Sequence, residues 1–226
     1  IYFERNAQKR VYPASTTKVM TALLALEKLS LSDYVTVSSR VIGVQQTNLG
    51  FRAGEQYKVE DLIYACLLKS ANDAAGVLAE AVGGTQENFV VMMNQRAAEL
   101  GAKSTNFANA HGLPSKGPQY TTAKDMALIF KQALQNKFFQ QAISLKYRII
   151  YSKTGRRHFL KSHNKALFLN WKKDVNGKTG FTQQAKSCFV GHFKKGSSIF
   201  IVDVFGCSKR WEDIKWLIEK QAKVDL

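Results

Sequence analysis

The stretch "VNGKTGFTQQAKSCFVGHF" at residues 175–193 joins a Lys-Thr-Gly triplet to a run whose alternation is typical of a β-strand. A hairpin turn, "KKGS" at residues 194–197, and a second apolar run, "SIFIVDVFG" at 198–206, follow it. The triplet at residues 178–180 therefore lies at the start of a predicted strand. The outer edge of that strand could pair with an extended substrate, and Gly180 would let the substrate backbone approach closely.

A phosphate-binding loop is excluded for the same residues. Such a loop needs a glycine five residues before its Gly-Lys pair, whereas position 172 is Lys172 and residues 173–176 contain no glycine. A phosphate loop also opens a helix, while the residues after Lys178 have the pattern of a strand. The triplet therefore needs another explanation.

A second Lys-Thr-Gly triplet lies at residues 153–155 in a different setting. It is followed by "RRHFLKSHN" at residues 156–164, a charged run without strand alternation. We interpret this copy as a basic hairpin turn, which makes Lys153 a surface residue.

The rest of the chain predicts helices in the middle and strands towards both ends. The apolar run "VMTALLAL" belongs to a helix at residues 15–29 that is entered through Pro13 and should be buried centrally. Further helices are predicted at residues 59–70, 72–84, 85–101, 121–134 and 210–221, and strands at 1–8, 34–39, 147–152, 185–193 and 198–206.

This order of elements predicts an α/β (α+β) fold with an antiparallel sheet flanked by helices. The sheet would be built from both chain ends, with a mostly helical lobe inserted between them. We expect one unit over residues 1–226, with a sheet lobe at about 1–30 and 146–226 and a helical lobe at about 31–145.

The composition narrows the classes of partner. Lys and Arg total 33 against 17 acidic residues, and a net charge of +16 favours anionic partners. The positive charges are scattered and no nucleic-acid-reading motif accompanies them, so we expect no nucleic-acid partner. Cys66, Cys188 and Cys207 have the spacing of neither a disulfide framework nor a zinc site, and we expect them to be small buried residues. No apolar run is long enough to span a membrane.

The helix entry "PASTTKVM" at residues 13–20 places Ser15 one turn before Lys18, on the same helix face. A serine hydroxyl needs a base within hydrogen-bond reach, and a lysine whose pKa is lowered by burial can be that base. The free N–H groups of a helix N-terminus can also stabilise an oxyanion. By itself, the pair is a weak signal, because a capping serine beside an exposed lysine is the far commoner origin of this spacing.

A second polar group, "SAN" at residues 70–72, joins two apolar helices. Ser70 or Asn72 can serve as an N-cap, and Ser70 can in addition relay a proton while the Asn72 amide positions a substrate. In the Lys-Thr-Gly triplet at residues 178–180, Lys178 and Thr179 would bind a substrate carboxylate.

The order Ser-x-x-Lys, Ser-x-Asn, Lys-Thr-Gly is the set found in penicillin-binding proteins and related β-lactamases. The chain resembles the low-molecular-mass penicillin-binding proteins of the D-alanyl-D-alanine carboxypeptidase family over nearly its whole length. The resemblance rests on "YPASTTKVMTALLALE" (12–27), "LGFRAGEQYKVEDLIYACLLKSANDAAGVLAE" (49–80), "MNQRAAELGAKSTNFANAHGLP" (93–114), "YTTAKDMALI" (120–129) and "GKTGFTQQAKSCFVG" (177–191).

The resemblance implies a role for each of these residues and no metal or cofactor. Ser15 would be the acylated nucleophile, Lys18 its base, Ser70 the proton relay, and Asn72 a contact to Lys18 and the substrate amide. Lys178 and Thr179 would hold the terminal carboxylate beside Gly180, and the backbone amides of Ser15 and Phe181 would form the oxyanion hole. A basic residue often found before the third motif corresponds to Lys165.

The implied reaction removes the terminal D-alanine from peptidoglycan stem peptides through an acyl-enzyme, in the bacterial cell envelope outside the cytoplasm. β-Lactam antibiotics would be inhibitors. The family normally has a strand and helix before the point where this chain begins, and many members carry a β-rich second domain and a membrane anchor after it; we expect these to be missing here.

Three alternative functions need to be compared with this one. A class A β-lactamase needs a Glu-x-x-Leu-Asn stretch, and "AELGAKSTN" at residues 98–106 has the wrong order. A DD-endopeptidase of peptidoglycan crosslinks shares all three motifs. A non-catalytic wall-binding protein is disfavoured because Ser15, Lys18, Ser70, Asn72 and Lys178 are all intact.

Overall fold

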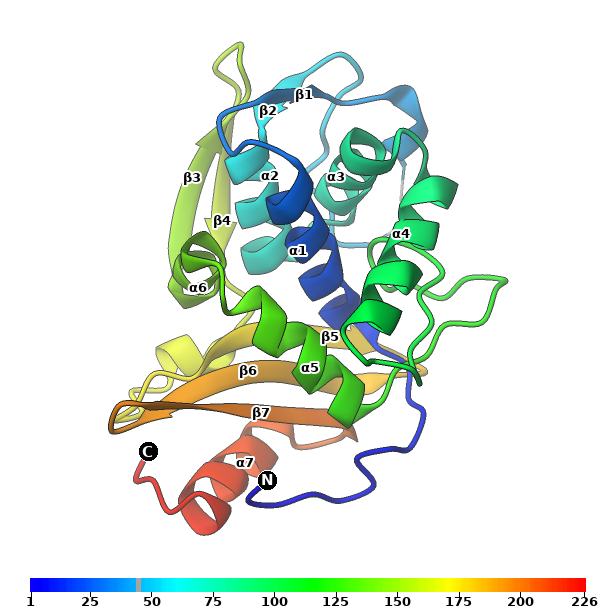
Figure 1. Cartoon of the computed structure of the whole chain (residues 1–226). Coiled ribbons are helices and arrows are strands. Elements are labelled where there is room, and N and C mark those ends of the chain that lie inside the picture. Colours follow the sequence, from blue (N-terminus) through cyan, green and yellow to red (C-terminus); the bar gives the residue numbers. More distant parts are fainter. Residues whose placement is uncertain (44–45) are drawn as a thin grey trace.

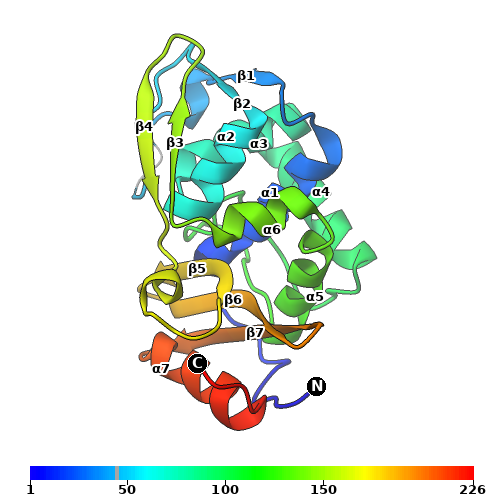
Figure 2. The same cartoon turned by 90° about the vertical axis from the view of Figure 1, so that its left-hand side faces the viewer.

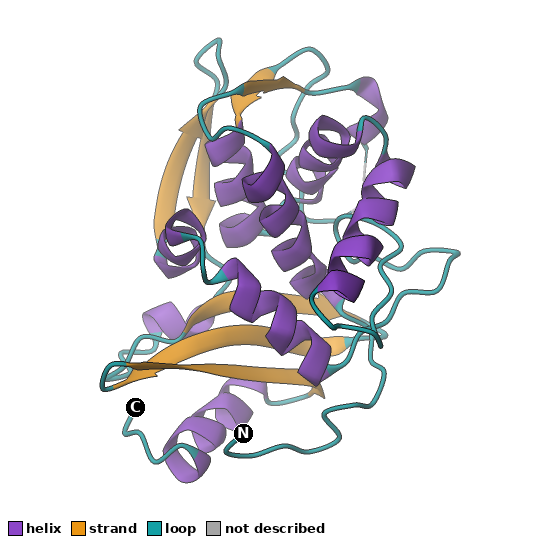
Figure 3. Cartoon of the chain, viewed as in Figure 1, coloured by secondary structure: helices purple, strands orange, loops and turns teal. Residues whose placement is uncertain are grey.

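The structure, a computed structural model, describes residues 1–43 and 46–226 as a group of helices packed on a three-stranded sheet (Figures 1 and 3). The antiparallel sheet has the order β5-β6-β7. Its strands are β5 (Asn176–Thr182), β6 (Lys186–Lys195) and β7 (Ser198–Cys207). The predicted mixed fold with an antiparallel sheet flanked by helices is confirmed.

The two faces of the sheet pack against different helices, because side chains alternate along each strand. Helix α5 (Ala123–Ala133) crosses one face, and α7 (Arg210–Trp216) lies on the other (Figure 1). On β6, Val190 joins the core of the helical part, whereas Phe189 and Phe193 pack in a second cluster with Ile214 of α7.

Helix α1 (Lys18–Lys28) lies at the centre of the helical part, with its residues 18–25 all buried. This confirms the central buried helix predicted from its apolar run. It is surrounded by α2 (Val59–Tyr64), α3 (Asn72–Gly83), α4 (Gln86–Glu99) and α5. A π-helical turn, η3 (Ala65–Lys69), extends α2 to the junction at Ser70.

Two smaller hairpins flank the helices. Strands β1 (Tyr34–Thr36) and β2 (Gln56–Lys58) form one, and β3 (Tyr147–Tyr151) and β4 (Arg157–Lys161) form the other (Figure 2). The Lys-Thr-Gly copy at residues 153–155 is the turn between β3 and β4, with Lys153 exposed, as predicted.

The charged run after that turn, predicted to lack strand structure, is strand β4. Exposure alternates along this strand: Arg157, Phe159 and Lys161 are exposed, whereas His158 and Leu160 are buried. The sequence interpretation was wrong because the exposed face of the strand carries the charges. Helix α6 (Lys137–Ser144), capped by the Asn136 side chain, was not predicted either.

The prediction that the sheet is built from both chain ends is wrong for the described residues. Residues 1–8 form no strand, and all three strands of the sheet lie between residues 176 and 207. Tyr2 and Phe3 instead place their rings on Phe200 and Trp216, with centroids 5.1 and 5.3 Å apart. In a strand, two consecutive side chains point to opposite faces, but Tyr2 and Phe3 both pack against the β7–α7 region. This segment therefore does not have the packing of a strand in the sheet. 

The run that begins with the triplet at residues 178–180 is also not one strand. A turn at residues 183–185 separates β5 from β6, so Gly180 pairs with Cys188 across the hairpin. Among the cysteines, Cys66 and Cys188 are buried as predicted, Cys207 is half-buried, and all three are free thiols. In the described residues, no helix has the length and apolar character needed to cross a bilayer.

Candidate active site

Ser15 lies in a 3-10 turn, η1 (Ala14–Thr17), that leads directly into α1. Residues three apart eclipse one another in a 3-10 turn, and Lys18 Nζ lies 3.0 Å from Ser15 Oγ. Ala14 has a φ of 46°, a left-handed conformation that is strained for a residue with a side chain. The predicted Ser-x-x-Lys pair is therefore formed, on a tight turn rather than on a regular α-helix.

Lys18 is completely buried and has three polar neighbours. Besides Ser15, its Nζ lies 2.7 Å from Asn72 Oδ1 and 2.8 Å from the His111 carbonyl oxygen. Burial lowers the pKa of Lys18 from 10.5 to about 8. A neutral amine has two N–H donors and one lone pair, which matches two acceptors and one hydroxyl donor. The same three contacts also suit an ammonium with three acceptors, so Lys18 can hold a proton here and, in its neutral form, receive the Ser15 proton.

Lys178, on β5, is the second buried lysine at the site. Its Nζ donates to Ser70 Oγ at 2.9 Å and to the Thr179 carbonyl oxygen at 2.8 Å. Burial and the charge of Lys18 lower the pKa of Lys178 well below its ordinary value. An incoming carboxylate would restore the protonated form, which makes this lysine suited to bind the acidic end of a ligand.

Ser70 and Asn72 come from one junction between η3 and α3. Ser70 is buried and has a φ of 60°, a left-handed backbone that ends the π-helical turn. This bend lets Ser70 face Lys178 while Asn72 faces Lys18. The structure thus brings five predicted residues together: Ser15, Lys18, Ser70, Asn72 and Lys178.

Two glycines allow the surrounding segments to approach η1. A Cβ on Gly180 would lie 3.1 Å from the Ser15 backbone nitrogen, so β5 passes directly beside the nucleophile. A Cβ on Gly112 would lie 1.8 Å from the Ala14 carbonyl oxygen, and Gly112 has a φ of 86°. Only glycine fits position 112, and this close approach places the adjacent His111 carbonyl on Lys18.

The remaining predicted residues have different settings. Thr179 is buried within β5, and the Phe181 side chain is 63% exposed next to it. Lys165 is exposed at the start of η4 (Lys165–Phe168). The roles of Thr179, Phe181 and Lys165 towards a ligand stay predictions.

Sequence reasoning missed two supports of the site. The His111 carbonyl is one, and Arg210 is the other: its Nη1 donates to the carbonyl oxygens of Gly180 and Cys188 at 3.1 and 2.9 Å. Arg210 therefore braces the β5–β6 hairpin from α7. For the His111 carbonyl, the sequence offers one indication of a constrained loop: in "HGLP" at residues 111–114, a glycine stands two residues before a proline.

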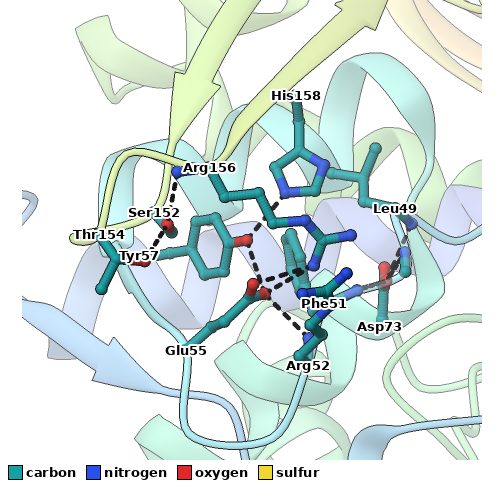
Figure 4. Close-up of polar contacts among 11 residues, drawn as sticks. Leu49, Phe51, Arg52, Glu55, Tyr57, Asp73, Ser152, Thr154, Arg156 and His158 are labelled. Carbon is teal, nitrogen blue, oxygen red and sulfur yellow. Dashed lines mark hydrogen bonds and ion pairs between the residues drawn. The ribbon is translucent and has the colours of Figure 1, made fainter.

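A polar network fixes the loop that precedes the site (Figure 4). The Asp73 carboxylate accepts hydrogen bonds from the backbone N–H groups of Leu49, Gly50 and Phe51, at 2.9, 3.0 and 3.4 Å. The Asn72 N–H donates to the Thr47 carbonyl oxygen at 2.8 Å. The residues 47–51 are thus held against the first turn of α3, which carries Asn72.

The other end of this loop is tied to the β3–β4 hairpin. The Glu55 carboxylate accepts from Arg156 Nη1 at 2.9 and 3.1 Å and from the Tyr57 hydroxyl at 2.9 Å. The Tyr57 hydroxyl is also hydrogen-bonded to His158 Nε2 at 2.8 Å, as Figure 4 shows. Both ends of the loop are therefore anchored in the fold. In the described residues, no group of three or more His, Cys, Asp or Glu side chains is arranged to hold a metal ion.

Residues 1–209 match the family Peptidase_S11, described as D-alanyl-D-alanine carboxypeptidase. The chain belongs to this family. Among relatives of this S11 chain, the carboxypeptidase DacF of Bacillus subtilis is 33% identical over 92% of the chain and 54% of DacF. DacB2 of Mycobacterium tuberculosis is 34% identical over 90% of the chain and 70% of DacB2. DacC of Escherichia coli is 34% identical over 90% of the chain and 52% of DacC.

Solved structures of S11-type enzymes have the same fold. The crystal structure of a D-alanyl-D-alanine carboxypeptidase from M. tuberculosis has a TM-score of 0.83 at 32% identity, covering 89% of this chain and 75% of that one. The R248L mutant of the Streptomyces K15 DD-transpeptidase has a TM-score of 0.84 at 27% identity, covering 92% and 85%. The chain spans about half the length of DacF and DacC.

Proposed function

We propose that this S11 chain is a serine DD-carboxypeptidase that removes the terminal D-alanine from peptidoglycan stem peptides. One observation carries the proposal: a buried lysine of lowered pKa lies 3.0 Å from Ser15 Oγ, with its other two donors already engaged. The family is described as D-alanyl-D-alanine carboxypeptidase, and this supports a reaction at the cell wall, outside the cytoplasm. Residues 1–226 would act as one catalytic unit.

In the acylation step, Lys18 takes the Ser15 hydroxyl proton as the oxygen attacks the carbonyl carbon of the penultimate D-alanine. The negative charge on the substrate oxygen would be held by the backbone N–H groups of Ser15 and Phe181. Ser70, hydrogen-bonded to Lys178, would relay this proton from Lys18 to the leaving D-alanine nitrogen, which returns Lys18 to its neutral form. The C–N bond breaks and leaves an ester on Ser15.

In the second step, water attacks this ester and gives up a proton to Lys18, and the Ser15 oxygen leaves and regains its hydroxyl proton. Lys178 and Thr179 hold the terminal carboxylate during acylation, and Asn72 fixes both Lys18 and the substrate amide. A β-lactam would form the same ester with Ser15 and act as an inhibitor. No nucleic acid takes part in this scheme.

The specificity is tested by comparing two soluble substrates, a stem pentapeptide that ends in D-alanyl-D-alanine and a crosslinked stem-peptide dimer. We expect free D-alanine from the pentapeptide, with kcat/KM at least about tenfold above that for cleavage of the dimer. A difference of that size corresponds to about 1.4 kcal/mol of transition-state binding. The reverse order would make the chain a DD-endopeptidase, and no turnover of either by folded protein would favour a wall-binding role.

A further inference from the structure

The β3–β4 hairpin has one face against the helical part and one face towards solvent (Figures 1 and 2). Ile150 and Leu160 are buried on its inner side. Its outer side is formed by alternate residues, three from β3 and three from β4, and all six are exposed. We call these residues the hairpin face: Tyr147, Ile149, Tyr151, Arg157, Phe159 and Lys161. This face plays no part in the chemistry at Ser15.

The hairpin face has an ordered layout because its residues pair across the two strands. Ile149 pairs with Phe159 at the centre, Tyr147 with Lys161 at one end, and Tyr151 with Arg157 at the other. Ile149 is 38% exposed and Phe159 is 52% exposed. An apolar centre therefore lies between two pairs that each combine a tyrosine with a cation, and these end pairs are about 13 Å apart along the strands.

Neighbouring residues extend the same pattern. The Tyr147 ring contacts Phe168 of η4, next to the exposed Leu169, and the ammonium groups of Lys146 and Lys161 lie over the Phe168 ring at 5.8 and 5.4 Å. Within residues 1–43 and 46–226, no carboxylate forms an ion pair with Lys146, Arg157 or Lys161. The hairpin face and its neighbours therefore combine exposed apolar side chains with positive charges that have no carboxylate partner among the described residues.

We propose that the hairpin face docks on a lipid bilayer surface that carries anionic headgroups. Exposed apolar side chains enter the boundary of the acyl region, tyrosines lie at headgroup level, and lysine and arginine bind the lipid phosphates. The layout of the hairpin face supplies each of these groups in the required order. Docking would hold the catalytic unit at the membrane surface.

Two other occupants fit less well. A soluble anionic polymer would engage Arg157 and Lys161 but would leave Ile149 and Phe159 in water. A second copy of this chain would bring two basic faces together, and the net charge of +16 on each chain opposes that contact. The lipid surface satisfies both the apolar centre and the cationic ends.

Flotation of the full chain with vesicles tests the proposal. We expect co-flotation with vesicles of phosphatidylcholine plus phosphatidylglycerol, little with phosphatidylcholine alone, and weaker binding at high salt. The double variant Arg157→Glu, Lys161→Glu should bind the anionic vesicles at least about thirtyfold more weakly. Its matched control, Lys103→Glu with Lys116→Glu, removes the same charge from exposed sites elsewhere and should lose much less.

The apolar centre is tested separately with Ile149→Ser, Phe159→Ser. Because the two side chains form one cross-strand pair on the outer face, the chain should stay folded with a small fall in melting temperature, while vesicle binding falls about tenfold or more. Val91→Ser with Ile199→Ser, at positions 51% and 46% exposed, is its control and should bind like the wild type. Equal losses in variants and controls, or equal binding to neutral vesicles, would overturn the proposal. So would apolar variants that bind normally, or a dimer in sedimentation that they dissociate.

Discussion

Lys18→Arg is expected to fold and to lose acylation by a β-lactam about 10²–10⁴-fold, the contribution typical of general-base catalysis. Arginine keeps the positive charge and can still donate to Asn72 Oδ1 and the His111 carbonyl oxygen. It cannot accept the Ser15 proton, because a guanidinium stays protonated at any accessible pH. The rate of adduct formation on the intact protein measures the loss, and a melting curve checks the fold.

The same assignment gives a pH dependence for the wild-type chain. Because burial lowers the pKa of Lys18 to about 8, the neutral amine is scarce below that pH and dominates above it. The second-order rate of acylation should therefore rise with pH and level off above about 8. A Lys18→Arg chain that acylates at nearly the wild-type rate, or a wild-type rate that falls over this range, would remove Lys18 from the role of base.

Lys178→Ala is expected to lose most D-alanine release, whereas Lys153→Ala keeps it. Lys178 is buried beside Ser70, and loss of a carboxylate-binding charge in such a site costs about 2–4 kcal/mol of transition-state stabilisation. Lys153 is exposed in the β3–β4 turn and joins the fold through its backbone N–H, which donates to the Gln56 carbonyl oxygen. Its replacement should change the free energy of unfolding by no more than about 0.5 kcal/mol.

The two lysines serve as each other's control, since both stand in Lys-Thr-Gly triplets of one chain. The measurement is kcat/KM for D-alanine release, with melting temperatures taken in parallel. Loss of activity in Lys153→Ala, together with near-normal activity in Lys178→Ala, would mean that the wrong triplet had been assigned to the site.

The parts of the fold that the sequence predicted well are those set by local interactions. The predicted helices at residues 85–101 and 121–134 are capped by Thr85 and Thr122, whose hydroxyl oxygens accept from backbone N–H groups three residues later, at 3.1 and 3.0 Å. Ser15 and Lys18 are likewise three residues apart, so one turn brings them together. These contacts depend on spacing, which a sequence displays directly.

The parts that could not be predicted depend on distant or backbone contacts. Tyr2 rests on Phe200, almost two hundred positions away, and this contact replaces the strand expected at the N-terminus. The acceptor that His111 offers Lys18 is a backbone carbonyl, which no side-chain pattern indicates. Arg210 likewise donates to backbone carbonyl oxygens of β5 and β6. It belongs to no sequence motif, so its contribution could not be predicted either.

The most direct test of the account is the position of the covalent adduct left by a β-lactam. Trypsin should release residues 11–18, "VYPASTTK", as the peptide that carries Ser15. We predict a mass increase of one intact β-lactam on this peptide, with fragmentation assigning it to Ser15, and no adduct on a folded Ser15→Ala chain. An adduct on another peptide, or none on folded wild-type protein, would contradict the assignment of Ser15 as the nucleophile.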